Sequence, residues 1–148
     1  MKFLNIIIIT YLILFTSKAL SASPIDTIKE VTKSWAHAFN SRDTEIILAH
    51  YSEKAVFWGT VSPTLRDEET EVRDYFKVIG PNARVSLGDQ RPRIFDDIAI
   101  NTGYYQFTDE SDGIRTKVNA RFSFVYERDA TGKWLIVDHH SSAIPVMD

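Results

Sequence analysis

Residues 132–145 read GKWLIVDHHSSAIP, and this stretch decides the fold. Gly132 suits a turn, and the apolar, β-branched residues after it are typical of a buried strand. The second half is polar, so the strand is expected to run from a packed core to a cavity mouth or an interface. Side chains alternate along a strand. One face is therefore expected to carry Trp134, Ile136, Asp138 and His140, and the other Leu135, Val137, His139 and Ser141.

The first 22 residues have the pattern of a secretory signal peptide. Lys2 precedes an apolar run at 6–15, and small residues follow at 17–22. The run is shorter than the roughly 20 apolar residues that a spanning helix needs, which favours cleavage over a retained membrane anchor. Cleavage after Ala19, Ser21 or Ala22 fits equally well. We therefore expect a signal peptide at 1–22, a single domain at 23–148, and export to a bacterial periplasm or secretion.

The composition narrows the class of protein. The chain has no cysteine, which excludes disulfides and an N-terminal lipid anchor on cysteine, and weakly favours a bacterial periplasm. Cleavage at residue 22 would leave 15 basic against 20 acidic residues, because it removes two lysines and no acid. A mildly acidic domain gives no support for nucleic-acid binding. After signal cleavage, no association with a membrane is expected.

The apolar periodicity predicts three helices followed mostly by strands. Helices are expected over residues 24–41, 44–51 and 67–78. Strands are expected over residues 55–60, 84–95 with a bulge at Gly88, 98–108, 116–127, and after Gly132. Residues 61–66 are expected to form a loop, and residues 109–113 a hairpin turn. This order predicts an α+β domain in which one curved antiparallel sheet carries the three helices of the N-terminal half on its concave face.

Four stretches resemble motifs of a known family. They are Trp35 with 39–40, Tyr51 with 56–60, residues 101–105, and the segment 132–145. The chain resembles the association domain of calcium/calmodulin-dependent protein kinase II and the SnoaL-like proteins, over about residues 25–145. The resemblance implies the cone-shaped nuclear transport factor 2-like fold, a pocket between sheet and helices, and dimers or larger rings built on the outer sheet face.

The alternation of side chains, combined with this resemblance, predicts a ligand pocket. Its expected lining is Trp58, Tyr75, Asn101, Tyr105, Phe122, Tyr126, His139 and Ser141. Aromatic walls with a few polar groups are typical of a small-molecule site. The alternative is that these aromatic side chains only fill the core, as we expect for Phe124. Association domains of the kinase line their pocket with arginines, and the matching positions here are Tyr105, Phe124 and Ser141, so an acidic ligand is not implied.

The other face of the sheet is predicted to form a homodimer or a larger ring, because a monomer would expose a contiguous apolar patch. The expected interface residues are Ile98, Ile100, Tyr104, Arg121, Val125, Trp134, Ile136, Asp138 and His140.

The paired histidines invite two chemical interpretations. Neighbours on a strand point to opposite faces, so His139 and His140 do not form a metal pair, and neither a metal nor a cofactor is expected. Asp138 and His140 share a face, which permits an oriented imidazole for acid–base work, but a hydrogen-bonded pair at a subunit interface is the preferred interpretation.

Three functions remain open from the sequence. The preferred one is a non-catalytic, exported, oligomerising module that binds a small organic ligand. The second is a SnoaL-like enzyme, an isomerase, cyclase or hydrolase of a small apolar substrate, with Asp138, His139 or His140 in acid–base roles. The third is an assembly domain with a filled interior.

Overall fold

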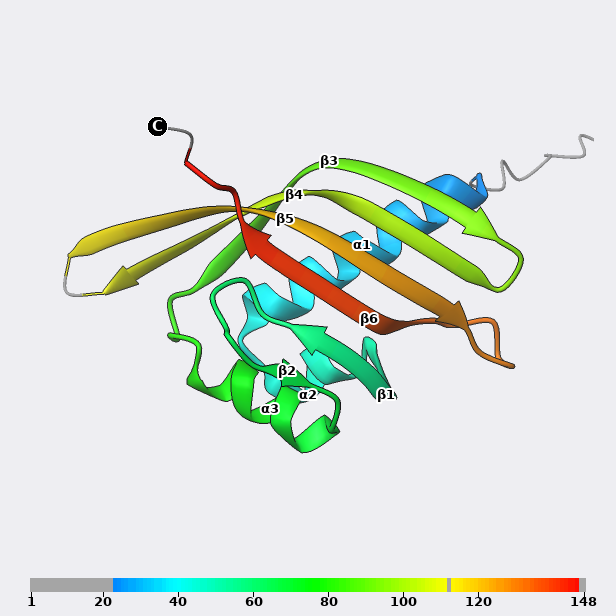
Figure 1. The fold of residues 1–148 in the computed structure, drawn as a ribbon, viewed down its shortest axis with the longest axis horizontal. Helices are drawn as coiled ribbons and strands as arrows, with labels where there is room; N and C mark the ends of the chain where they lie inside the picture. Colours follow the sequence, from blue (N-terminus) through cyan, green and yellow to red (C-terminus); the bar gives the residue numbers. More distant parts are fainter. Residues whose placement is uncertain (1–22, 112, 147–148) are drawn as a thin grey trace, which may run out of the picture.

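A computed structural model of the chain describes residues 23–111 and 113–146 (Figure 1). The signal peptide predicted for residues 1–22 lies outside this part and stays a prediction. In sequence order the elements are α1 (Pro24–Ser41), α2 (Thr44–Leu48), β1 (Tyr51–Trp58), β2 (Leu65–Arg66), α3 (Glu69–Val78), β3 (Arg84–Phe95), β4 (Ile98–Ser111), β5 (Ile114–Arg128) and β6 (Trp134–Ala143). None of the helices in these two ranges is long and apolar enough to cross a membrane.

Helix α1 is defined at both ends by its sequence. The Ser23 hydroxyl accepts a hydrogen bond from the backbone N–H of Asp26 at 3.2 Å, and Pro24 occupies the first turn, where its missing N–H is not needed. The helix ends at Ser41, and the capping residue after it, Arg42, has a left-handed φ of 62°. Its buried stripe consists of Ile28, Thr32, Trp35, Ala36, Ala38 and Phe39. The helix predicted for residues 24–41 is confirmed.

The Arg42 side chain connects α1 to α3. Its Nη2 donates to the carbonyl oxygens of Phe76 at 3.2 Å and Ile79 at 3.1 Å, and its guanidinium lies 4.8 Å from the centre of the Phe39 ring. A cation at the C-terminal end of a helix is stabilised by the unpaired carbonyls and the helix dipole. The two helices are therefore held together as one wall.

Three differences from the sequence prediction bear on the extent of the sheet. Helix α2 ends at Leu48, because Tyr51 already pairs with β6 and opens β1. The expected loop at 61–66 contains the short strand β2. The predicted turn at 109–113 is shorter, because residues 109–111 continue β4 and pair with residues 114–116 of β5. Each difference extends the sheet.

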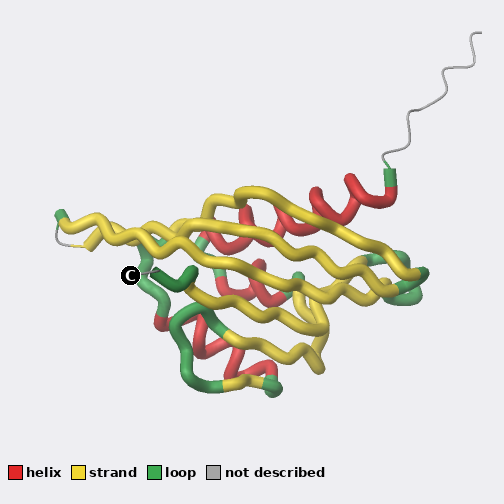
Figure 2. Tube along the Cα trace, turned by 45° about the horizontal axis from the view of Figure 1, so that its top comes forward, coloured by secondary structure: helices red, strands yellow, loops and turns green. Residues whose placement is uncertain are grey.

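The sheet has six strands in the order β2-β1-β6-β5-β4-β3. Strands β3 to β6 form the expected antiparallel meander, whereas β1 runs parallel to β6. Figures 1 and 2 show one curved layer with all three helices on the same side. Helix α1 packs against β3 and β4, and α3 contacts β1 and β2. The predicted α+β architecture is confirmed, with one parallel pair among the described strands.

Strand β3 carries the predicted bulge. Its pairing with β4 shifts between Leu87 and Gln90, next to Gly88. Gly103 lies opposite Gln90, and a Cβ at Gly103 would approach the carbonyl oxygen of Asp89 to 2.1 Å. Only glycine fits this position without moving the backbone of β3.

A second bulge, in β6, was not predicted. Ile136 pairs with Tyr126, but Asp138 pairs with Val125, so Val137 is the extra residue. The pairing of β6 with β1 is irregular at the same point. A bulge changes the face on which the following residues lie. The two halves of β6 therefore do not share one alternation.

Asn40 joins the end of α1 to the start of β3. Its Nδ2 donates to the carbonyl oxygen of Val85 at 2.9 Å, and its Oδ1 accepts from the Val85 N–H at 2.7 Å. The amide group thus supplies the two hydrogen bonds that a neighbouring strand would supply to β3. This contact fixes the distance between α1 and the sheet edge.

Candidate functional site

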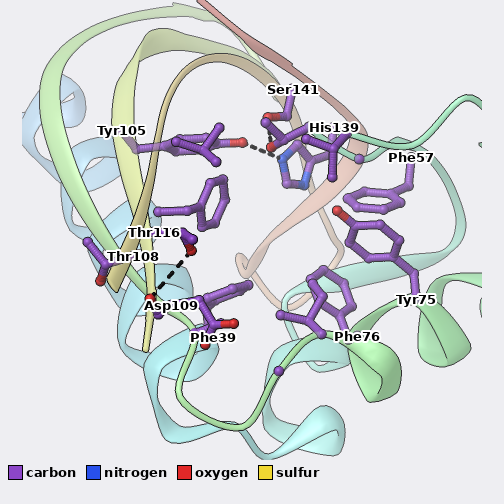
Figure 3. A pocket seen from close by; sticks show the side chains of 18 of the residues that line it. Phe39, Phe57, Tyr75, Phe76, Tyr105, Thr108, Asp109, Thr116, His139 and Ser141 are labelled. Carbon is purple, nitrogen blue, oxygen red and sulfur yellow. Dashed lines mark hydrogen bonds between the residues drawn. The ribbon is translucent and has the colours of Figure 1, made fainter. Parts of the chain in front are cut away.

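A cavity of about 170 Å³ lies between the inner face of the sheet and helices α1 and α3 (Figure 3). Its walls are mostly aromatic and come from α1, β1 with the loop after it, α3, β4, β5 and β6. The exposed residues Val61 and Thr116 line it where it opens to solvent. A cavity of roughly 150 Å³ can hold one benzene ring. The space therefore suits a small organic molecule.

The β4 wall is a single row of side chains. Tyr105, Phe107 and Asp109 alternate onto the inner face, and Phe107 and Asp109 pair with Val118 and Thr116 of β5. The phenol of Tyr105 lies toward His139, and Asp109 lies at the other end of the row (Figure 3). The cavity thus has an aromatic middle and a polar group at each end.

A chain of hydrogen-bonded, buried polar groups lies at the Tyr105 end of the cavity. Nε1–H of Trp35 donates to the Tyr51 hydroxyl at 3.0 Å. That hydroxyl lies 2.8 Å from Nδ1 of His139, and Nε2 of the same ring lies 3.4 Å from the Tyr105 hydroxyl. Because an indole N–H can only donate, the Tyr51 hydroxyl is the acceptor in its bond with Trp35. Both ring nitrogens of His139 thus have a tyrosine hydroxyl as partner.

Burial keeps this chain uncharged. It lowers the pKa of His139 well below its ordinary value, and the neighbouring His140 acts in the same direction. Burial raises the pKa of Tyr51 and that of Tyr105, because a phenolate would lose its hydration there. The hydroxyls of Thr60 and Ser141 bond to each other and interact with Tyr105. At neutral pH this end of the cavity therefore offers hydroxyls and no charge.

Asp109 provides a carboxylate at the other end. Its Oδ1 is buried and has no hydrogen-bond partner among the described residues. Thr116, opposite on β5, donates to the backbone carbonyl of Asp109 at 3.4 Å and not to its side chain. The carboxylate lies against Gly80, where a Cβ would lie 2.9 Å from Oδ2. The Asp109 side chain lines the cavity, and none of the ion pairs among the described residues includes it.

Four of the eight residues predicted for the pocket line this cavity: Tyr75, Tyr105, His139 and Ser141. Tyr105, His139 and Ser141 lie there because the alternation on β4 and on the polar half of β6 follows the predicted register, and Tyr75 comes from helix α3. Whether they bind a ligand stays a prediction.

The other four predicted pocket residues lie elsewhere, and this part of the prediction is wrong. Trp58 is 41% exposed on the outer face, because alternation on β1 turns its neighbour Phe57 inward instead. Asn101 and Tyr126 both bond to Thr32 of α1, at 2.8 and 2.9 Å, since α1 covers that half of the inner face. Phe122 stacks on the Tyr105 ring, with 5.0 Å between centroids, and does not line the cavity.

Several lining residues were missed by sequence reasoning. Phe39 and Phe76 belong to the apolar helix stripes and were read only as core positions. Phe57 could have been found from its alternation with Trp58. Asp109 could have been found by extending the alternation of Tyr105 along β4, but its polar neighbours suggested a turn.

The outer face of the sheet carries most of the residues predicted for the interface. Cross-strand pairing aligns Ile98, Ile100, Tyr104, Arg121, Val125, Asp138 and His140 on this face. The prediction for Ile136 is wrong, because this residue is fully buried opposite Tyr126. Trp134 is also wrong, since it packs against the core beneath Arg128. Both errors come from the bulge at Val137.

The geometry bears on the acid–base interpretation of residues 138–140. Asp138 and His140 share the outer face, away from the cavity. Burial raises the pKa of Asp138, and His140 opposes that effect. His139 does reach the cavity, but both of its ring nitrogens already have partners, Tyr51 and Tyr105. Within residues 23–111 and 113–146, no group of three or more His, Asp or Glu side chains could hold a metal ion.

Comparison with known proteins assigns the family. Residues 26–145 match the family model of the calcium/calmodulin dependent protein kinase II association domain. The chain belongs to this association domain family. A solved structure from Xanthomonas campestris that carries the same family description is 30% identical, with a TM-score of 0.76 over 82% of this chain and 88% of that one. No curated protein matches the chain.

More distant structures share the fold of this association domain. The S. rosetta CaMKII hub is 22% identical, with a TM-score of 0.71 over 83% of this chain and 98% of the hub. A nuclear transport factor 2-like superfamily protein from Salmonella enterica is 14% identical, with a TM-score of 0.72 over 83% of this chain and 92% of that one. The predicted nuclear transport factor 2-like fold is confirmed.

The cavity of this association domain is lined by few charged side chains. Its described lining includes neither lysine nor arginine. Asp109 is the one charged side chain among the described lining residues, since burial keeps His139 neutral.

Proposed function

We propose that this association domain is an exported, non-catalytic module that self-associates through the outer face of its sheet and holds a small organic ligand in its cavity. The observation that carries self-association is the composition of the outer face. Tyr104, Phe95, Trp58 and Ile98 are 55, 56, 41 and 37% exposed, and cross-strand pairing gathers them on that face. Large apolar side chains exposed together on one face of a sheet are typical of an interaction surface.

Polar groups complete the outer face as an interface. Arg121 Nε donates to the Ser142 hydroxyl at 3.0 Å, and His140 lies beside Trp58, 6.5 Å between ring centres. An apolar centre with a polar surround is the usual anatomy of a protein interface. The description of the S. rosetta relative as a hub is consistent with the same arrangement. The occupant we propose is a second copy of the chain.

Light scattering on the mature protein tests self-association. We expect the mass of a dimer or larger ring at micromolar concentration. Tyr104→Glu should lower the assembled mass, because it brings an unpaired charge into the contact. Val78→Glu is the matched control: Val78 is 80% exposed on α3, away from the sheet face, and its change should leave the mass unaltered. A monomeric wild type, or assembly unaffected by Tyr104→Glu, would refute the proposal.

The cavity supports binding rather than catalysis. The hydroxyls of Tyr105, Ser141 and Thr60 can orient a ligand, whereas both nitrogens of the imidazole beside them already have tyrosine hydroxyls as partners. Asp138 and His140, the other candidates for acid–base work, lie on the outer face. Export rests on the sequence of residues 1–22 alone.

A further inference from the structure

The charge of the cavity indicates what class of ligand it takes, provided that it binds a ligand as proposed above. Asp109 is the one charged side chain among its described lining residues. Its Oδ1 is buried without a hydrogen-bond partner in the described part of the chain. A buried carboxylate oxygen without a partner is costly, and a charged donor in the cavity would relieve that cost.

Nearby cations do not use this carboxylate. Arg42 is close enough for Asp109 to raise its pKa, although burial and Arg84 lower that pKa by more. The Arg42 guanidinium donates to the carbonyl oxygens of α1 and α3. Arg84 donates to the carbonyl oxygens of Pro81 and Ala83, at 3.0 and 2.8 Å. None of the ion pairs among the described residues includes Asp109.

The walls next to Asp109 also suit a cation. Phe107 precedes it in the inner row of β4, and the Phe39 ring packs against Phe107 with 5.4 Å between centroids. The faces of aromatic rings attract cations, more strongly where water is excluded. Toward the other end, the cavity is lined by Tyr105, Phe57 and neutral hydroxyls. An anion would meet Asp109 with no lining cation to compensate it.

We propose that the cavity selects a small organic amine, with its ammonium group at Asp109 and its apolar body among the aromatic side chains. The volume of about 170 Å³ limits the body to about one six-membered ring. This inference rests on the proposed binding role of the cavity and adds the charge of the ligand.

Three probes of one shape test the inference: benzylamine, benzyl alcohol and benzoate. Binding to the mature protein at pH 7 is followed by calorimetry and by the NMR signals of the cavity tyrosines. We expect benzylamine to bind roughly tenfold tighter than benzyl alcohol, as one charge-assisted hydrogen bond would give, and benzoate to bind weakest. Asp109→Asn should remove the preference for the amine. Glu110→Gln, the same change at the exposed neighbouring residue, should preserve it.

The outcomes separate this inference from the proposed function. If benzyl alcohol or benzoate binds as tightly as benzylamine, the cavity is a binding site and the charge selection is refuted. If Asp109→Asn keeps the full preference, the assignment to Asp109 is wrong. If none of the three probes perturbs the cavity tyrosines of the folded wild type, the binding role fails and the inference fails with it. The ratio measured on the wild type decides the matter even if Asp109→Asn does not fold.

Discussion

Replacing Tyr51 by phenylalanine should strongly destabilise the protein although it removes one oxygen atom. The Tyr51 hydroxyl accepts the indole N–H of Trp35 at 3.0 Å and is hydrogen-bonded to Nδ1 of His139, 2.8 Å away. The side chain is 8% exposed, so water cannot take the place of the hydroxyl. The change leaves two buried polar groups without partners, each costing about 1–3 kcal/mol. We expect the free energy of unfolding to fall by about 2–4 kcal/mol.

Urea unfolding at one fixed protein concentration measures this loss, because self-association would otherwise change the apparent stability. Thr70→Val is the control. Thr70 is exposed on α3, away from the outer face of the sheet, so removing its hydroxyl should change the unfolding free energy by less than about 0.5 kcal/mol.

A double-variant cycle tests the reasoning behind the number. In a His139→Phe background the His139 ring nitrogen is absent, so Tyr51→Phe leaves only the Trp35 N–H without a partner. Tyr51→Phe should then lower the free energy of unfolding markedly less than in the wild type. A cost below about 1 kcal/mol in the wild type, or the same cost in both backgrounds, would contradict the buried polar chain.

Three further predictions address other features. Burial lowers the folded-state pKa of His139, so below about pH 6.5 the unfolded chain binds a proton at this histidine that the folded chain does not. The free energy of unfolding is therefore at its full value above about pH 6.5 and falls below it by up to about 1.4 kcal/mol per pH unit. His139→Phe should flatten this slope in urea titrations more than His50→Gln, since His50 is less buried. Gly103→Ala should destabilise by roughly 2–4 kcal/mol in the same assay, because its Cβ would overlap the carbonyl of Asp89; unchanged stability would show that β3 moves freely. Mass spectrometry after expression in a Gram-negative host should find an N-terminus between Leu20 and Ser23, and intact protein in membranes would contradict export.

The polar end of the cavity could be predicted because local alternation, combined with the family resemblance, is enough to specify it. Tyr105 and His139 lie on strands whose side chains alternate regularly between the two faces at that end, so counting along the strand assigned both residues to the correct face. Asn101 has the same parity as Tyr105 but meets Thr32 of α1 instead. The path of a helix across a sheet is a tertiary feature that strand periodicity does not contain. Asn101 and Tyr126, two of the four misplaced lining residues, were lost for this reason.

The remaining errors have two local causes. Asp109 was assigned to a turn because the residues after it are polar, yet the backbone pairing of β4 and β5 continues past it and turns its side chain inward. Ile136 was assigned to the outer face because strict alternation was counted backwards from His139. Neither a continued ladder nor an extra residue in a strand leaves a distinct mark in a single sequence.

The bulge at Val137 also affects how related chains should be aligned. Two residues, Val137 and Asp138, occupy the span that Val125 alone occupies on the neighbouring strand. Deleting Val137 would restore a regular ladder and leave His139 on the cavity side and Ile136 in the core. A one-codon loss closer to the end of the strand, after His139, would instead turn Ser141 outward. Alignment gaps in this strand are therefore best placed between Ile136 and His139, where the chain can lengthen or shorten by one residue without exchanging its faces.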